Sequence, residues 1–395
     1  MDSRSDDAPS LGGARKEGAP LRVLHVSQPT VAGVSYIVAN LVRDQVTRGW
    51  HVSVASPPTG SLPDLIRAEG ATHLRWPATR QPGPRSLAET VRLGRLVRSV
   101  APHIVHLHSS KAGLAGRLAV RGGRSTLFQP HGWSFDALHG PLRTAALLWE
   151  RNGARWADAV VCVSDGERQR GIRARVRADL RLIPNGIDLA SWPPAGPAGR
   201  EAARAALQLP GGPLVVCVGR LSRAKGQDLL LDAWPAVLRR IPEAQLVLVG
   251  DGPNRDSLRR RRIPQVRMAL DRPDVAQWLT AADVVAAPSR WEGMSLVVLE
   301  AMAVGRSVVA SDAPGMWELL GTDAGAVVPQ GDLHGLATAL VDRLLDRNRV
   351  SAEERAARDR VQQLHAWEVM AERIRELYGE LLERRAARGG DSRTG

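Results

Sequence analysis

The chain has 395 residues, 44% of them hydrophobic, which is long for one core and comfortable for two. Its net charge is +13, but aromatic residues make up only 4%, so we expect no nucleic-acid partner, because single-strand binders interleave basic residues with aromatic stacking platforms. No run approaches the roughly 20 apolar residues that cross a bilayer, and Cys162 and Cys217 lie in apolar runs typical of buried strands, which argues against disulfides and a cysteine metal site.

The first twenty residues contain no apolar segment of the signal-peptide type, and we predict that residues 1–20 form a disordered tail. We therefore expect a cytoplasmic protein. Only three of the 54 basic residues are lysines, so much of the arginine excess is explained by compositional bias. A basic surface still favours phosphate groups or an anionic membrane face, and peripheral binding to the inner face of the cell membrane stays open.

In the first half, residues 21–26 (LRVLHV) predict a strand, followed by the loop SQPTVAG, a helix over 34–48 and a strand over 51–55. This order opens a doubly wound parallel sheet. Further strands are expected at 102–108, within 126–132, at 159–164 and at 180–184. Ligand crevices in such sheets lie beyond the carboxyl ends of the strands. Ser109, Ser110 and Lys111, which follow one strand end, are therefore candidate ligand contacts.

Three of the histidines on or just after these strands are considered as site residues. His106 and His108 are two residues apart and would share one strand face. The nearby sequence offers no carboxylate or cysteine to complete a metal-ligand set, which favours a structural or site-lining role over a metal site. His131 comes just past a strand end with Gly132, where a structural role and a site contact both stay open.

Residues 141–156 (PLRTAALLWERNGARW) mix arginine and tryptophan in an amphipathic pattern. This segment either lies on an acidic bilayer or packs against the core of its own domain. The Pro/Gly-dense stretch at 191–199 (SWPPAGPAG) predicts a linker.

A second sheet is predicted from strands at 214–219, 245–250, 266–270, 307–311 and 326–329. Arg220 and Lys225 follow its first strand, where an arginine and a lysine suit an anionic ligand. The last helix, at about 365–387, is long, charged and amphipathic. We predict an N-terminal domain at 21–190, a C-terminal domain at 191–362 and a final helix at 363–388.

Residues 288–305 (PSRWEGMSLVVLEAMAVG) predict a loop and then a helix that Ser295 caps and Gly305 ends. The positive N-terminus of that helix favours an anion. If a diphosphate lies there, Glu292 in the loop reaches one end of the ligand, and Glu300, about one turn into the helix, reaches the other. A nucleotide-sugar has this shape.

This stretch resembles the signature of retaining glycosyltransferases of family 4, and three other segments support the resemblance: GRLSRAKG at 219–226, PHG at 130–132 and NGID at 185–188. The likeness covers about residues 21–385 and is stronger in the second half. It implies an α/β fold of the GT-B type, in which two Rossmann-like domains face each other across a cleft and the C-terminal helix crosses back to the first domain. The acceptor would bind to the first domain, with Ser109, Ser110 and Lys111 as candidate contacts for it, and the donor would bind to the second.

The resemblance also assigns roles to residues. His131 would make a donor-sugar or catalytic contact, with Phe135 completing an HG-x-x-F segment. The other residues expected to be catalytic are Glu292, Arg220 and Lys225. Gly33 would bring the backbone close to the sugar, although most members have two glycines where this chain has Ala32 and Gly33. Glu292 would bind sugar hydroxyls and Glu300 the ribose. The remaining donor-site candidates would hold the diphosphate: Gly219, Arg220, Lys225, Gly293, Met294, Ser295 and Leu296.

The expected activity is the transfer of a hexose-type sugar from a UDP- or GDP-linked donor to a hydroxyl, with retention of configuration and with no metal or cofactor, because Arg220, Lys225 and helix amides replace the metal at the departing diphosphate. The family commonly has a glycine near Ala269, so the base stays open. The segments HSSKAG and PHG are similar to those of transferases that build bacterial polysaccharides on lipid carriers. A soluble glycoside or secondary-metabolite acceptor, a sugar-nucleotide epimerase and a non-catalytic nucleotide-sugar-binding protein are the alternatives.

Overall fold

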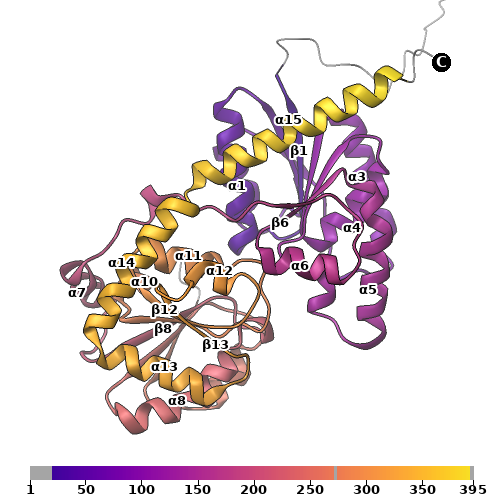
Figure 1. Cartoon of the computed structure of the whole chain (residues 1–395). Helices are drawn as coiled ribbons and strands as arrows, with labels where there is room; N and C mark the ends of the chain where they lie inside the picture. Colours follow the sequence, from indigo (N-terminus) through magenta and orange to yellow (C-terminus); the bar gives the residue numbers. More distant parts are fainter. Residues whose placement is uncertain (1–19, 271–273, 392–395) are drawn as a thin grey trace, which may run out of the picture.

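The computed structural model describes residues 20–270 and 274–391, with side chains through residue 388. The predicted disordered tail therefore lies outside the described residues, apart from Pro20. Within the described chain, two parallel sheets form two lobes (Figure 1).

The first sheet has the strand order β3-β2-β1-β4-β5-β6-β7. Its strands are β1 (Arg22–Ser27), β2 (His51–Ser56), β3 (Thr72–Arg75), β4 (Ile104–His108), β5 (Ser125–Gln129), β6 (Ala159–Cys162) and β7 (Leu180–Leu182). The helices that connect them are α1 (Ala32–Thr47), α2 (Leu62–Ala68), α3 (Ser86–Val100), α4 (Ser109–Val120), α5 (Gly140–Gly153) and α6 (Asp165–Arg173). The order reverses between β1 and β4, so a crevice is expected beyond their carboxyl ends.

The second sheet has the order β10-β9-β8-β11-β12-β13 and reverses between β8 and β11. Its strands are β8 (Leu214–Val218), β9 (Gln245–Val249), β10 (Val266–Ala269), β11 (Val284–Ala287), β12 (Ser307–Ser311) and β13 (Gly325–Val328). Its helices are α7 (Pro197–Ala206), α8 (Gln227–Arg240), α9 (Arg255–Arg260), α10 (Val275–Ala281), α11 (Leu296–Ala303), α12 (Met316–Leu320), α13 (Leu333–Leu345) and α14 (Arg347–Leu364). Strands β8, β9 and β12 are short runs containing several valines and are buried on both faces, as parallel strands between helix layers require.

The final helix, α15 (Trp367–Asp391), begins beside the second lobe and crosses back over the first (Figure 1). Ile374, Leu377 and Leu381 share a buried cluster with Val23 of β1 and Ile104 of β4. The predicted GT-B architecture with a crossing C-terminal helix is therefore confirmed.

The chain crosses between the lobes twice, and the two crossings lie side by side. Ile187 of the first pairs with Ala366 of the second in an isolated parallel bridge. One local prediction is wrong. The linker expected at 191–199 is helical from Pro197 onward, because proline suits the first turn of a helix, where an N–H has no intrahelical acceptor. Both cysteines are free and buried, as expected.

Candidate active site

Helix α11 begins where the sequence predicted, with Ser295 at the N-cap position. The capping prediction itself is wrong, since in the described structure the Ser295 side chain makes no hydrogen bond to the helix N-terminus. The first N–H groups of a helix have no intrahelical acceptor. The start of α11 therefore keeps donors that an anionic ligand can use.

Lys225 and Glu292 come together in front of this helix. The Lys225 Nζ lies 2.5 Å from Glu292 Oε1, and the Ser289 hydroxyl donates to the same oxygen at 2.8 Å. Lys225 follows β8 and Glu292 follows β11, the two strands that flank the order reversal. Both side chains are partly exposed, at 24% and 13%. An arriving anion can thus reach the ammonium that Glu292 now neutralises.

The loops after β8 and β11 are in direct backbone contact. Gly226 has φ +68°, and a Cβ there would lie 1.9 Å from the Pro288 carbonyl oxygen, so only glycine fits. This contact fixes the position of Lys225, the preceding residue. Arg220, in the same loop, has an exposed side chain, and Gly219 precedes it with φ +147°.

Glu300, on α11, is partly exposed at the residue level. Burial of its carboxyl raises the pKa from 4.5 to about 7, and the positive charge of Lys225 opposes that shift. The carboxyl is therefore poised to ionise near neutral pH.

The first lobe meets this site at several points, and two of them are close approaches at glycines. A Cβ on Gly293 would lie 2.9 Å from the Gly132 nitrogen and 3.0 Å from the His131 carbonyl carbon, so the His131–Gly132 turn packs directly on the Glu292–Gly293 loop. A Cβ on Gly33 would meet the Leu296 side chain at 3.2 Å. The predicted residues of both halves of the sequence are therefore neighbours in space.

The acceptor-side candidates are not equivalent. Ser109 and Ser110 are partly exposed at the start of α4. The Lys111 side chain is only 2% exposed, with Nζ 2.6 Å from Glu89 Oε2 and 2.7 Å from the Ser86 hydroxyl. A buried ammonium held in an ion pair does not reach an acceptor, so Lys111 has a structural role, which corrects the expectation from its place after a strand end.

One residue that the sequence analysis missed holds the His131–Gly132 turn. The buried Glu167 carboxylate accepts hydrogen bonds from the backbone N–H groups of Gly132 at 2.5 Å and Val163 at 2.7 Å, and burial raises its pKa to about 7. Ser164 caps α6 by accepting from the Glu167 N–H at 3.0 Å. The Ser-x-x-Glu spacing at 164–167 is a helix-start signal that could have identified the pair.

His106 and His108 belong to a larger buried group. One ring nitrogen of each, together with one of His25 on β1, forms a group of three atoms within 4.8 Å of one another, and the His131 ring lies next to His108. Burial lowers the pKa of each of these histidines, so all are neutral at pH 7. Neutral imidazoles can bind a metal ion, and His25, which the sequence analysis did not consider, adds a third ring to His106 and His108.

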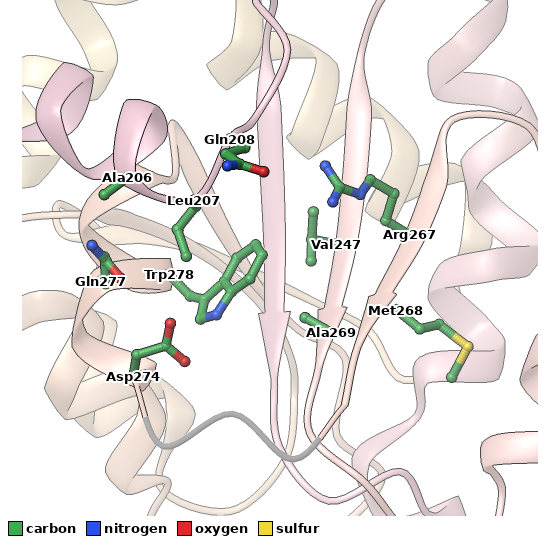
Figure 2. A pocket seen from close by; sticks show the side chains of 10 residues that line it. All are labelled: Ala206, Leu207, Gln208, Val247, Arg267, Met268, Ala269, Asp274, Gln277 and Trp278. Atoms are coloured by element: carbon green, nitrogen blue, oxygen red, sulfur yellow. The ribbon is translucent and has the colours of Figure 1, made fainter.

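A pocket of about 210 Å³ lies elsewhere, beside β9 and β10 and under α10 (Figure 2). Trp278 and Leu207 are among its walls, with Asp274 and Arg267 at its sides. Ala269, near which the family commonly has a glycine, is part of its lining, but none of the candidate catalytic, donor-binding or acceptor-side residues is. The candidate site is thus defined by side-chain chemistry at the two order reversals and not by this hollow.

These features define a class of protein. Two Rossmann-like lobes joined by a crossing C-terminal helix make up the GT-B fold. Residues 31–191 match the family described as Glycosyltransferase Family 4, and residues 212–346 match the one described as Glycosyl transferases group 1. The chain belongs to glycosyltransferase family 4, and it is an enzyme that transfers a sugar from a nucleotide-sugar.

Similar proteins agree with this assignment. The chain is 31% identical, over 79% of its length and 84% of the relative, to a GDP-mannose-dependent alpha-(1-6)-phosphatidylinositol monomannoside mannosyltransferase of Mycobacterium tuberculosis. It is 25% identical, over 92% of its length and 97% of the relative, to a UDP-Gal:alpha-D-GlcNAc-diphosphoundecaprenol alpha-1,3-galactosyltransferase of Escherichia coli. Its fold is similar to that of Anabaena Alr3699/HepE, solved with UDP and glucose, with a TM-score of 0.80 at 22% identity over 91% of this chain and 100% of that one.

Family 4 enzymes of the GT-B type generally act without a metal ion. Within residues 20–270 and 274–391, no helix combines the length and apolar character that a membrane crossing needs.

Proposed function

We propose that this enzyme is a retaining hexosyltransferase whose acceptor is a sugar carried on a lipid. The observation that carries the site assignment is the Lys225–Glu292 pair in front of the uncapped start of α11, with His131–Gly132 packed against it from the other lobe. A cation, an acid and helix amides at one point suit a diphosphate joined to a sugar.

The donor diphosphate takes the position between the two lobes. Its negative charge binds Lys225, Arg220 and the first N–H groups of α11, including those near Met294 and Ser295, and it displaces Glu292 from Lys225. Glu292 then accepts hydrogen bonds from sugar hydroxyls, near His131 and Gly33. Glu300, four residues beyond Leu296, lies about 6 Å further along the helix axis and accepts from the ribose hydroxyls.

The rate enhancement comes from stabilising the departing diphosphate. Charge that develops on its oxygens as the glycosidic bond breaks is met by preorganised positive groups, which is the same task that a metal performs in other transferases. The site therefore requires no metal. Retention by double displacement needs a carboxylate nucleophile close to the anomeric carbon. We favour front-face transfer, in which the leaving phosphate accepts the proton of the acceptor hydroxyl.

The acceptor assignment rests on the relatives. The mycobacterial relative is named for a phosphatidylinositol mannoside acceptor and the Escherichia coli relative for a diphosphoundecaprenol-linked sugar. One is named for GDP-mannose and the other for UDP-Gal, so the base and hexose are the open variables of the proposal.

Helix α5 supports a peripheral location on a membrane. Leu142 and Leu148 are 66% and 51% exposed on it, and Arg143 and Arg151 lie on the same helix. Exposed leucines beside arginines suit the interface of an anionic bilayer. Flotation with vesicles containing anionic lipid, and no flotation with neutral vesicles, is the expected result.

The test has two stages. A thermal-shift panel of UDP- and GDP-sugars identifies the donor, and the stabilising donor is then incubated with lipid-linked and soluble sugar acceptors. Transfer to the lipid-linked sugar with the donor's anomeric configuration is the expected result. Transfer only to soluble glycosides overturns the acceptor assignment. Conversion of the donor without any acceptor would indicate an epimerase, and binding without turnover a non-catalytic protein.

A further inference from the structure

A line of hydrogen bonds runs from helix α1 to His131 through the interior of the first lobe. Gln45 Oε1 lies 2.9 Å from His25 Nε2, and His25 Nδ1 lies 3.0 Å from His108 Nε2. His108 Nδ1 in turn lies 3.3 Å from His131 Nε2. The ring planes of His25 and His108 differ by 24°, as do those of His108 and His131. Together with the short distances between the nitrogens, this places the rings edge to edge. We call these four residues the histidine relay.

The relay is sealed from solvent over most of its length. Gln45 is 1% exposed, and His25 and His108 are fully buried, whereas His131 keeps partial exposure. Burial lowers the pKa of His25 to about 4 and that of His131 to about 3, and lowers the pKa of His108 well below its usual range. Each ring is therefore neutral at pH 7 and carries one N–H.

A neutral ring that donates a hydrogen bond from one nitrogen accepts one at the other. The donor–acceptor direction of the first hydrogen bond in the relay therefore determines the direction of all the others. The Gln45 oxygen can only accept, which places the His25 proton on Nε2 and makes His25 Nδ1 an acceptor. His108 then donates from Nε2 and accepts at Nδ1. His131 must donate from Nε2, which leaves its Nδ1 free of a proton.

We propose that Gln45 is a positioning residue that selects the tautomer of His131 through His25 and His108, so that His131 offers an unprotonated Nδ1 to a hydroxyl of the bound substrate. The catalytic consequence rests on the proposed function, because it takes His131 to contact the sugar that is transferred. The tautomer itself does not depend on any substrate. Gln45 belongs to α1, which packs on the opposite side of β1 and β4 from the first-lobe helices α3 and α4, and its side-chain oxygen bonds to His25, which is not a candidate site residue.

The alternative use of these histidines is a metal site formed by His25, His106 and His108. Two nitrogens bound to one zinc at 2.0–2.1 Å in tetrahedral geometry stand roughly 3.3 Å apart. The His25 and His108 nitrogens are closer than that, at 3.0 Å, as a direct hydrogen bond requires. His106 is outside the relay, since its Nδ1 lies 2.8 Å from the Tyr378 hydroxyl on α15. The geometry therefore favours hydrogen bonding over a shared ion.

The test is a ring-nitrogen NMR spectrum of the full-length protein labelled with ¹⁵N-histidine, in which protonated and unprotonated nitrogens are distinguished. The His131 signals are assigned by their loss in His131→Asn. In the wild type we expect the His131 proton on Nε2. Gln45→Met removes the acceptor at the start of the relay while keeping the side-chain length, and we expect the His131 proton to move wholly or partly to Nδ1.

Asn40→Leu is the matched control, since it also replaces a buried amide on α1 by an apolar side chain but lies outside the relay. It should leave the His131 tautomer as in the wild type. His25→Phe interrupts the relay one step further along and repeats the test if Gln45→Met does not fold. A wild-type proton on Nδ1, no change in both relay variants, or an equal change in Asn40→Leu would overturn the proposal. Stoichiometric zinc that His25→Phe loses would do the same.

Kinetics test the catalytic consequence separately. With the donor found by thermal shift, Gln45→Met should lower kcat by roughly three- to tenfold, the value of one hydrogen bond, with little change in the KM for the donor. A changed tautomer with unchanged kcat would overturn the catalytic part of the proposal. Because the NMR measurement needs no substrate, failure of the proposed function and failure of the relay are distinguishable.

Discussion

The raised pKa of Glu300 predicts that the donor binds more tightly as pH rises. Burial holds the carboxyl pKa at about 7 in the free enzyme, whereas its usual value is 4.5. If the carboxylate accepts hydrogen bonds from the ribose hydroxyls, only the ionised form binds the donor well. The bound state then has a lower pKa, and binding releases a proton at and below pH 7.

The size of the effect follows from the pKa. With a pKa of about 7, about one molecule in eleven is ionised at pH 6 and about ten in eleven at pH 8, so the affinity should rise about tenfold between these pH values, or about 1.4 kcal/mol. The raised pKa of Glu300 has the opposite effect on the stability of the free enzyme, which falls as pH rises. A carboxyl whose folded pKa lies above its unfolded value makes the fold less stable as pH rises from about 4.5 through 7.

Isothermal titration calorimetry at pH 6, 7 and 8 measures this directly. The titrant should be an intact nucleotide-sugar, because its diester phosphates do not titrate in this range, unlike the terminal phosphate of a nucleoside diphosphate. Buffers of different ionisation enthalpy report the proton released. Glu300→Gln should abolish both the pH dependence and the proton release. A donor affinity that does not change with pH in the wild type would refute the reasoning. A pH dependence that persists in Glu300→Gln would indicate that Glu167, whose pKa is also about 7, is the group that titrates.

Four other outcomes are expected. Glu292→Gln and Arg220→Ala should each lower turnover at saturating donor by about two powers of ten or more, and near-normal turnover in both would contradict the site. EDTA should leave activity unchanged, whereas strict metal dependence would refute leaving-group stabilisation by protein groups alone. Glu167→Gln should weaken its two backbone contacts, destabilising the turn by about 1–3 kcal/mol, which hydrogen exchange detects as faster exchange there. Arg117→Met should lower the free energy of unfolding in urea by about 3–5 kcal/mol, because it leaves the buried Glu150 carboxylate, 2.8 Å from that guanidinium, unpaired.

Two of these variants have a control within the chain. Arg223→Ala matches Arg220→Ala, because both arginines are exposed in the loop after β8, and it should retain turnover. The double variant Arg117→Met/Glu150→Met should recover much of the lost stability, since replacing both members of a buried ion pair by apolar side chains leaves no uncompensated charge. Unchanged exchange at the turn in Glu167→Gln would show that the carboxylate does not hold it.

The sequence alone determined the architecture and named the residues of the proposed donor site. The runs LVVCV and SVVAS contain several valines, which are β-branched, and turn residues bound them. This local pattern specifies buried parallel strands. The sequence also predicted the helix after Ser295 and the charged residues around it, because a helix start and the end of a strand are each encoded by a few neighbouring residues.

The tertiary structure alone decided which polar residues are available to a ligand. Lys111 and Lys225 follow strand ends in the same way, yet Lys111 is buried against Glu89, 22 residues away in sequence, whereas Lys225 faces Glu292 at the site. The histidine relay likewise joins residues of α1, β1, β4 and the loop after β5. Burial and hydrogen-bond partners depend on contacts between segments distant in sequence, and a pKa or a tautomer depends on them in turn. No local pattern records those contacts, which is why the chemistry of these side chains appears only once the chain is folded.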